Sequence, residues 1–262
     1  MEYSIVFGAS GGIGKEFCTY LASRGDNLII SGRSENKLEL LKNLIYKIND
    51  KISVLTLPIN LQDENNRQTA FNYLKEQNVK IKGLYFVAGI DTRKPFENYT
   101  QVKISTQVRV NFESAVDVAR FCLENRAENL DMLIVSSACG FTPMPYYSLY
   151  SATKSGLIYF FKGLKSELKG KKVKITILCP GSVPTRKDIV EDIKLQGLTG
   201  KFSKKSPEYV VKKAMKALDK NKTICIPGTY NKILNFLSKL TPYKVQSAII
   251  KRKFKDIPKD AF

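Results

Sequence analysis

Short apolar runs alternate with longer amphipathic segments along most of the chain. Strand-sized runs such as Leu130–Val135 and Val173–Leu178 are predominantly apolar, which is typical of strands covered by helices on both faces. Strands that alternate with helices favour a parallel sheet with right-handed crossovers. The expected strands are 3–7, 27–31, 52–57, 83–87, 130–136, 173–179 and 223–226. The expected helices lie near 12–24, 35–48, 62–77, 100–127, 150–169 and 207–220.

This pattern predicts one doubly wound α/β domain with a central parallel sheet of about seven strands. We expect the domain to span residues 1–226. We expect residues 227–262 to form a basic, amphipathic, helical C-terminal extension packed on the same domain. A charged segment with two glycines at 186–206 is expected to be a mobile lid.

The composition narrows the chemistry. The chain has no histidine, which excludes Ser-His-Asp and Cys-His triads and His-ligated zinc, and we expect no metal site. An acid/base group must therefore be Tyr, Lys, Asp, Glu or Cys. The five cysteines form no CxxC pair, no apolar run reaches the roughly 18 to 20 residues of a membrane span, and no signal peptide is recognisable. We expect a soluble cytoplasmic protein.

The net charge is +19, but the lysines are spread along the whole chain. This distribution favours a solvated basic surface over nucleic-acid binding, which we do not expect. The C-terminal extension carries eight Lys/Arg against two Asp/Glu, and Ile233, Phe236, Leu237 and Leu240 form a helical stripe. Such a stripe is typical of a helix that packs on the protein, covering a pocket or a dimer contact. Peripheral contact with an anionic membrane is the alternative.

A glycine-rich turn follows the first expected strand and precedes the first expected helix. It reads Gly8-Ala-Ser-Gly-Gly-Ile-Gly14, and its backbone turns tightly before a helix N-terminus that favours anions. The position predicts a dinucleotide phosphate site. The second strand ends in Gly32-Arg33, without the carboxylate that would select NAD, so NADP(H) is favoured over NAD(H).

Tyr150 and Lys154 lie one helical turn apart on the helix expected at 150–169. A phenol is a poor acid/base at neutral pH, but a nearby ammonium lowers its pKa, so the pair suits proton transfer. Ser137 follows the strand at 130–136, where ligands of open α/β sheets bind, and its hydroxyl is placed to hold a substrate oxygen. We assign its neighbour Ser136 a structural role.

These motifs, in this order, resemble the short-chain dehydrogenase/reductase family over residues 3–226, nearest to its 3-ketoacyl reductase and hydroxysteroid dehydrogenase branch. The resemblance implies a Rossmann fold with Ser137, Tyr150, Lys154 and Asn111 as catalytic residues. It implies that Tyr150 exchanges a proton with the substrate, and that Asn111 supports a water-linked proton path. The implied cofactor-binding residues are Gly8, Ser10, Gly12, Ile13, Gly14, Arg33, Asn60, Leu61, Ala88, Gly89, Tyr150, Lys154, Pro180, Gly181, Val183 and Thr185.

The chain departs from the family pattern at two places near the adenine. The segment 86–89 lacks the family's asparagines, and Asn60-Leu61 stands where an acid is common. Both departures concern adenine contacts and leave the reaction unaffected.

The aromatic segment 140–147 is expected to line a substrate pocket, although packing within a loop is an equal alternative. The proposed substrate-binding residues are Ser137, Phe141, Met144, Tyr147 and Tyr150. The favoured function is an NADP(H)-dependent oxidoreductase of a lipophilic carbonyl or secondary alcohol, of 3-ketoacyl or steroid and bile-acid type. The resemblance implies a homodimer or homotetramer. The alternatives are a catalytically silent NADP(H)-binding regulator and a basic membrane-associated binding module.

Overall fold

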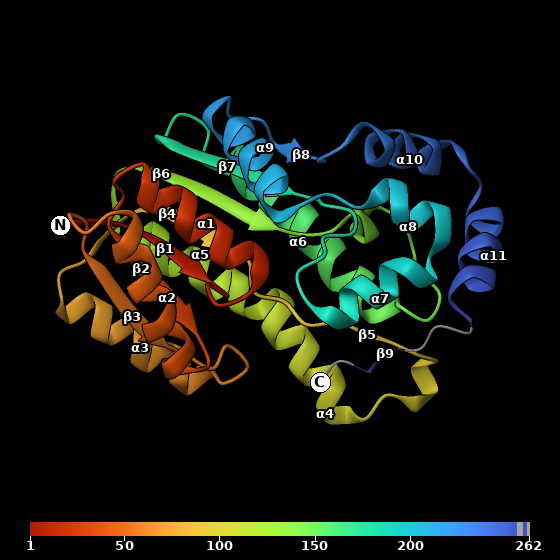
Figure 1. The fold of residues 1–262 in the computed structure, drawn as a ribbon, viewed down its shortest axis with the longest axis horizontal. Coiled ribbons are helices and arrows are strands. Elements are labelled where there is room, and N and C mark those ends of the chain that lie inside the picture. Colours follow the sequence, from red (N-terminus) through yellow and green to blue (C-terminus); the bar gives the residue numbers. More distant parts are fainter. Residues whose placement is uncertain (256–258, 261–262) are drawn as a thin grey trace.

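Seven parallel strands form the central sheet of the computed structural model, which describes residues 1–255 and 259–260. Their spatial order is β3-β2-β1-β4-β6-β7-β8, so the chain reverses direction across the sheet between β1 and β4 (Figure 1). This confirms the predicted fold class. The strands are β1 (Glu2–Phe7), β2 (Leu28–Gly32), β3 (Val54–Pro58), β4 (Lys80–Phe86), β6 (Arg126–Val135), β7 (Val173–Leu178) and β8 (Ile224–Cys225).

Helices cover both faces of the sheet and bury two apolar cores. One core lies under α1 (Gly12–Ser23), α2 (Glu35–Ile48) and α9 (Pro207–Asp219). The other lies under α3 (Glu64–Glu76), α5 (Ser114–Glu124) and α6 (Ser148–Glu167). Because both faces are covered, the central strands are buried nearly throughout, which explains their apolar composition.

Several helices begin at a side-chain cap that the sequence supplies. The capping oxygens belong to Ser34, Asp63, Thr100 and Ser206, and each accepts a hydrogen bond from the backbone N–H three residues later. The caps satisfy backbone donors that a helix start leaves without partners. The predicted starts of α2, α3 and α9 therefore agree with the structure to within two residues.

The helix expected at 100–127 is divided. It consists of α4 (Gln101–Val108), a π-helical turn called η2 (Arg109–Glu113), and α5, after which β6 begins at Arg126. The fully buried Arg67 of α3 clamps this region by pairing with Glu113 and Asp117 and by donating a 2.7 Å hydrogen bond to Leu61 O. A wide π turn of this kind is frequently found at functional sites.

The segment 186–206 is largely helical, which corrects the expectation of a loop. It contains α7 (Lys187–Leu195) and α8 (Gly197–Ser203). Gly197 has φ +59° and joins the two helices, and a Cβ on Gly200 would lie 2.2 Å from Ile193 O. The two glycines therefore allow a tight helix junction, and they are not a sign of an irregular lid.

The C-terminal extension forms two helices, α10 (Thr229–Leu240) and α11 (Tyr243–Phe254), beyond the carboxyl ends of the strands (Figure 1). Strand β9 (Lys259–Asp260) then pairs with β5 (Thr92–Arg93). Asn231 fastens α10 to the domain by donating hydrogen bonds to Ser203 O (3.1 Å) and Pro227 O (2.8 Å). Within the described residues, every helix is too short or too polar to cross a lipid bilayer.

Candidate active site

One cavity of about 910 Å³ runs from the glycine turn, along the carboxyl ends of the strands, to α10 and α11. Every residue that the sequence analysis assigned to the cofactor lines this cavity, and so do the three chemical residues Ser137, Tyr150 and Lys154. Segments as distant in sequence as 8–14 and 180–185 thus meet at one site. The cavity lies beside the strand reversal between β1 and β4, where open α/β sheets bind ligands.

The glycine turn is shaped so that side chains would obstruct it. Gly8 has φ +81°, and a Cβ there would lie 2.8 Å from Ala88 N. A Cβ on Gly14 would lie 2.1 Å from Gly8 O, and one on Gly12 would lie 2.6 Å from the Thr185 Cβ. The turn therefore requires glycine, and α1 begins at Gly12, so its N-terminal N–H groups are available to phosphate oxygens.

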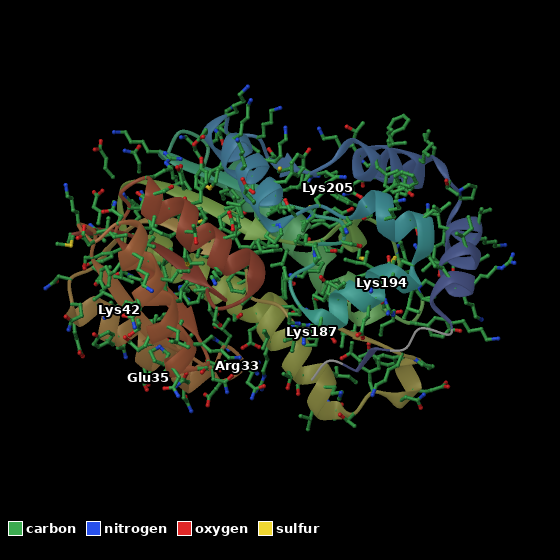
Figure 2. The ribbon with its side chains drawn as sticks, viewed as in Figure 1. Arg33, Glu35, Lys42, Lys187, Lys194 and Lys205 are labelled. Carbon is green, nitrogen blue, oxygen red and sulfur yellow. The ribbon has the colours of Figure 1, made fainter. Side chains whose placement is uncertain are left out.

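The end of β2 fits a ribose that carries an anion. Ser31 Oγ lines the cavity and is buried, and the described residues offer it no hydrogen-bond partner. Arg33 (labelled in Figure 2) and Lys37 also line the cavity, and both residues are exposed. Asn60 lines the same region, and its Oδ1 accepts a 3.4 Å bond from Gln62 N. A dinucleotide therefore fits the residues present.

Ser137 comes from the turn after β6, and Tyr150 and Lys154 come from α6. Lys154 is 3 % exposed, donates a 2.9 Å hydrogen bond to Val135 O, and lies 5.8 Å from the centre of the Tyr150 ring. Ser136 Oγ donates a 2.7 Å bond to Lys154 O, which is a structural role. A Cβ on Gly89 would lie 3.1 Å from Lys154 Nζ. Because Gly89 has no side chain, the ammonium can be reached from the cavity.

Burial dominates the protonation of this group of residues. It raises the pKa of Tyr150, as do the neighbouring Cys139 and Asp91, whereas the hydrogen bond with Ser137 lowers the pKa of that phenol. Burial also lowers the pKa of Lys154 to about 8. The sequence analysis expected a lowered pKa for this phenol, but the pKa is raised. The loss of hydration on burial outweighs the contact with Ser137 that favours the phenolate.

Asn111 lies in η2 and is completely buried behind the cavity wall. Its Oδ1 accepts from Ile90 N (2.8 Å), and its Nδ2 donates to Ile90 O (2.9 Å) and to Thr153 Oγ1 (3.1 Å). Ile90 lines the cavity, whereas Asn111 is absent from the described lining. The structure thus shows Asn111 holding the segment after β4 against α6.

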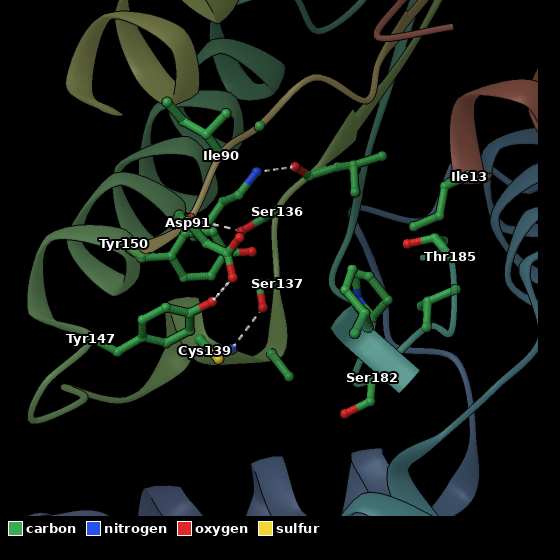
Figure 3. Close-up of a pocket in the computed structure, with 18 of the residues that line it drawn as sticks. Ile13, Ile90, Asp91, Ser136, Ser137, Cys139, Tyr147, Tyr150, Ser182 and Thr185 are labelled. Carbon is green, nitrogen blue, oxygen red and sulfur yellow. Dashed lines mark hydrogen bonds between the residues drawn. The ribbon is translucent and has the colours of Figure 1, made fainter. Parts of the chain in front are cut away.

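Sequence reasoning missed a charged and aromatic cluster beside Tyr150. The Tyr147 ring stacks on the Tyr150 ring at 4.6 Å, and the Tyr147 hydroxyl donates to Asp91, as Figure 3 shows. The buried Arg93 lies 5.8 Å over the Tyr147 ring and pairs with Asp192 of α7. The position of Asp91, just after β4, was the available signal, because ligands bind at the carboxyl ends of such strands.

The substrate end is built differently from the expectation in two respects. Met144, Tyr147 and Tyr150 line the cavity with Ser137. Phe141 does not. It lies at the end of a 3-10 turn and packs against the apolar core under α3, α5 and α6. The C-terminal extension instead supplies the apolar wall. Its contributing residues are Leu234, Leu237, Ile249, Ile250 and Phe254.

Comparison with known proteins agrees with this geometry. The very-long-chain 3-oxoacyl-CoA reductase of Anas platyrhynchos is 26 % identical, and the alignment covers 97 % of this chain and 84 % of that protein. A solved structure from work on 7β-hydroxysteroid dehydrogenase stereoselectivity superimposes with a TM-score of 0.82 at 20 % identity, covering 95 % of this chain and 96 % of that one. A short-chain dehydrogenase from Sphingobium yanoikuyae in complex with NADPH gives a TM-score of 0.76 at 19 % identity, covering 100 % and 98 %.

The model of the short chain dehydrogenase family matches residues 2–193, a range that holds the glycine turn, Ser137, Tyr150 and Lys154. The fold, the cavity and this match lead to one conclusion: the chain belongs to the short-chain dehydrogenase family and is a nicotinamide-dependent oxidoreductase of alcohol and carbonyl groups.

Proposed function

We propose that this enzyme is an NADP(H)-dependent reductase that interconverts a carbonyl and a secondary alcohol on a lipophilic 3-oxoacyl or steroid-type substrate, with Tyr150 as acid/base. The observation that carries the proposal is the single cavity in which Ser137, Tyr150 and Lys154 share a wall with the glycine turn. Figure 3 shows Ser137 and Tyr150 on one side, with Ile13 and Thr185 across from them.

Each residue has a role that follows from its contacts. The Tyr150 hydroxyl gives a proton to the carbonyl oxygen during reduction, and a half-buried phenol of raised pKa is held in the proton-bearing form that this step needs. Ser137 contributes a second hydrogen bond to the same oxygen. Lys154 has three donors, one of which binds Val135 O, so others are available to ribose hydroxyls. The nicotinamide, when bound, supplies the hydride.

The preference for NADP(H) rests on the end of β2. The cavity rim there holds Arg33 and Lys37, and the β2 end brings no carboxylate toward the ribose. A guanidinium binds a phosphate in a bidentate manner, whereas an acidic side chain would repel one. The solved Sphingobium relative that contains NADPH has the same fold.

The substrate class rests on the lining of the cavity beyond Tyr150. Met144, Leu234, Leu237, Ile249 and Ile250 give that end an apolar wall. The cavity volume is near the upper end of the range of roughly 300–1,000 Å³ for small-molecule sites. Relatives named for 3-oxoacyl-CoA and hydroxysteroid substrates point to the same bulky, apolar class.

The proposal is tested with a panel of 3-oxoacyl-CoA esters and ketosteroids, with NADPH consumption as the readout. We expect turnover of at least one lipophilic ketone, and its loss in Tyr150→Phe while NADPH affinity is retained. Wild-type turnover in Tyr150→Phe would remove the phenol from the mechanism. NADPH binding without turnover of any ketone would favour the silent regulator.

Cofactor preference is tested separately with Arg33→Ala. Loss of one charge-assisted contact should weaken NADPH binding by roughly tenfold and leave NADH binding almost unchanged. The matched control is Arg120→Ala, which removes an equally cationic side chain on α5, outside the cavity lining. Equal losses for the two cofactors would show that Arg33 does not bind the phosphate.

We also propose a homodimer or homotetramer assembled through α4–α5 and α6. Val102 and Tyr159, on these helices, are each 73 % exposed, so a partner subunit placed there would cover apolar side chains. Light scattering should give a multiple of the 29.6 kDa chain mass. Tyr159→Asp should shift the assembly toward smaller species.

A further inference from the structure

The helices α10 and α11 carry a dense set of exposed apolar side chains. Phe236 is 61 % exposed, Leu240 is 67 % exposed and Ile249 is 60 % exposed. The full set on these helices and the turn between them is Ile233, Leu234, Phe236, Leu237, Leu240, Tyr243, Val245 and Ile249. We call these residues the C-terminal apolar surface. Contiguous exposed apolar patches on monomers commonly mark interaction sites.

Helix α8 extends this surface. Leu198 is 71 % exposed and Phe202 is 52 % exposed, and the Phe202 ring lies 5.7 Å from that of Tyr230 at the start of α10. Lys253 of α11 donates to Thr199 of α8, so the three helices meet at one end of the molecule. Figure 1 shows them together beyond the carboxyl end of the sheet.

The charged residues of the same segment are all basic. Residues 229–255 contain no Asp or Glu and seven basic residues, namely Lys232, Lys239, Lys244, Lys251, Arg252, Lys253 and Lys255. Lys194 and Lys205 lie in the same half of the molecule (Figure 2). Apolar side chains accompanied only by cationic ones are typical of helices that lie on an anionic membrane surface.

The cavity reaches this surface. Leu234, Leu237 and Ile249 line the cavity, yet they are 42 %, 49 % and 60 % exposed. Side chains that both line a cavity and face the outside stand at its mouth. The substrate end of the cavity therefore opens among the residues of the C-terminal apolar surface.

We propose that the C-terminal apolar surface docks peripherally on an anionic lipid bilayer, and that a lipophilic substrate passes from the bilayer directly into the cavity. A second copy of the chain is a poorer occupant, because an isologous contact would place the seven like charges of each copy near those of the other. The docking stands without the proposed function. The passage of substrate rests on the proposed function.

The docking is tested by co-sedimentation with vesicles of phosphatidylcholine plus phosphatidylglycerol, and with vesicles of phosphatidylcholine alone. The wild-type protein should bind the anionic vesicles, and added salt should weaken this binding through screening. Phe236→Glu/Leu240→Glu should lower the partition coefficient by roughly tenfold or more, because two apolar side chains leave the bilayer and two charges replace them. Neither residue lines the cavity.

The matched control is Leu40→Glu/Ile48→Glu, which makes the same change on α2, where the side chains are 70 % and 40 % exposed at the other end of the molecule. It should bind vesicles like the wild type. A second test is Lys239→Glu/Lys244→Glu, which should weaken binding to anionic vesicles only. NADPH affinity is measured on every variant, so a failure of docking is distinguished from a failure of cofactor binding.

Three results would overturn the docking. One is a wild-type protein that does not bind anionic vesicles at low salt. Another is an equal loss of binding in the α10 and α2 double variants. The third is a wild-type dimer, detected by light scattering, that Phe236→Glu/Leu240→Glu separates, because a second copy would then be the occupant. If docking holds but a membrane-dissolved ketone is turned over no faster than a dispersed one, the passage of substrate is wrong.

Discussion

Arg67 and its two acidic partners differ in burial, so we expect the loss of stability to depend on which side of the ion pair is removed. The guanidinium is 1 % exposed, donates a 2.9 Å bond to Asp117, pairs with Glu113, and donates to Leu61 O. Its two acidic partners are 32 % and 41 % exposed. Removing the acids would leave a buried charge with one carbonyl acceptor, whereas removing the arginine would leave two carboxylates that water already reaches.

The expected magnitudes follow from this asymmetry. Glu113→Ala/Asp117→Ala should lower the free energy of unfolding by about 3–5 kcal/mol, as for other buried ions that lose their partner. Arg67→Met fills a similar volume with an apolar chain and abolishes the buried charge. It should cost about 1–2 kcal/mol, mainly through the lost hydrogen bond to Leu61 O.

The assay is equilibrium unfolding in urea at neutral pH, with the slope of the transition checked for two-state behaviour. The acid double variant should have the lower midpoint, and combining it with Arg67→Met should recover part of the loss. The reasoning is refuted if Arg67→Met destabilises the protein as much as the acid double variant does, or if the combined variant is the least stable.

Three further predictions concern the site. Asn111→Ala should lower the free energy of unfolding by about 2–3 kcal/mol, since both backbone groups of Ile90 lose a buried partner; calorimetry should show a midpoint lower by roughly 5–10 °C. The folded pKa of Lys154, about 8, lies below the ordinary value of about 10.4, so the unfolded chain binds the proton more tightly. The free energy of unfolding of the wild type, relative to that of Lys154→Met, should therefore rise between pH 8 and 10. A difference that does not change with pH would contradict the burial effect. Gly14→Ala should abolish NADPH binding in a titration, since its Cβ would meet Gly8 O at 2.1 Å, while Gly163→Ala, with no atom within 4 Å, should bind normally.

The sheet and the nucleotide half were readable from the sequence because their signals are local. The apolar strands, the capped helix starts and the turn from Gly8 to Gly14 each lie within a few consecutive residues. Their order along the chain then determines the topology, because parallel strands joined by helices allow few arrangements. This is why the residues that line the nucleotide end of the cavity could be named before the fold was seen.

The substrate end was less predictable because it depends on contacts between distant segments. Asp91, Tyr147 and Asp192 meet only through folding, and no spacing in the sequence relates them. The stripe on α10 correctly indicated an amphipathic helix, but periodicity does not say which side a neighbour covers. The protonation of Tyr150 was misjudged for a similar reason, since the distance to Lys154 is visible in the sequence and the degree of burial is not.

The division of the cavity between two parts of the chain has an evolutionary consequence. The segments up to Thr185 shape the nucleotide end, while α10 and α11, encoded after the last strand of the sheet, line the mouth at the other end. Mutations in these last helices can remodel ligand selectivity without disturbing hydride chemistry or the β-sheet. Exchange of this segment between paralogues would therefore change which ketones the enzyme accepts as substrates.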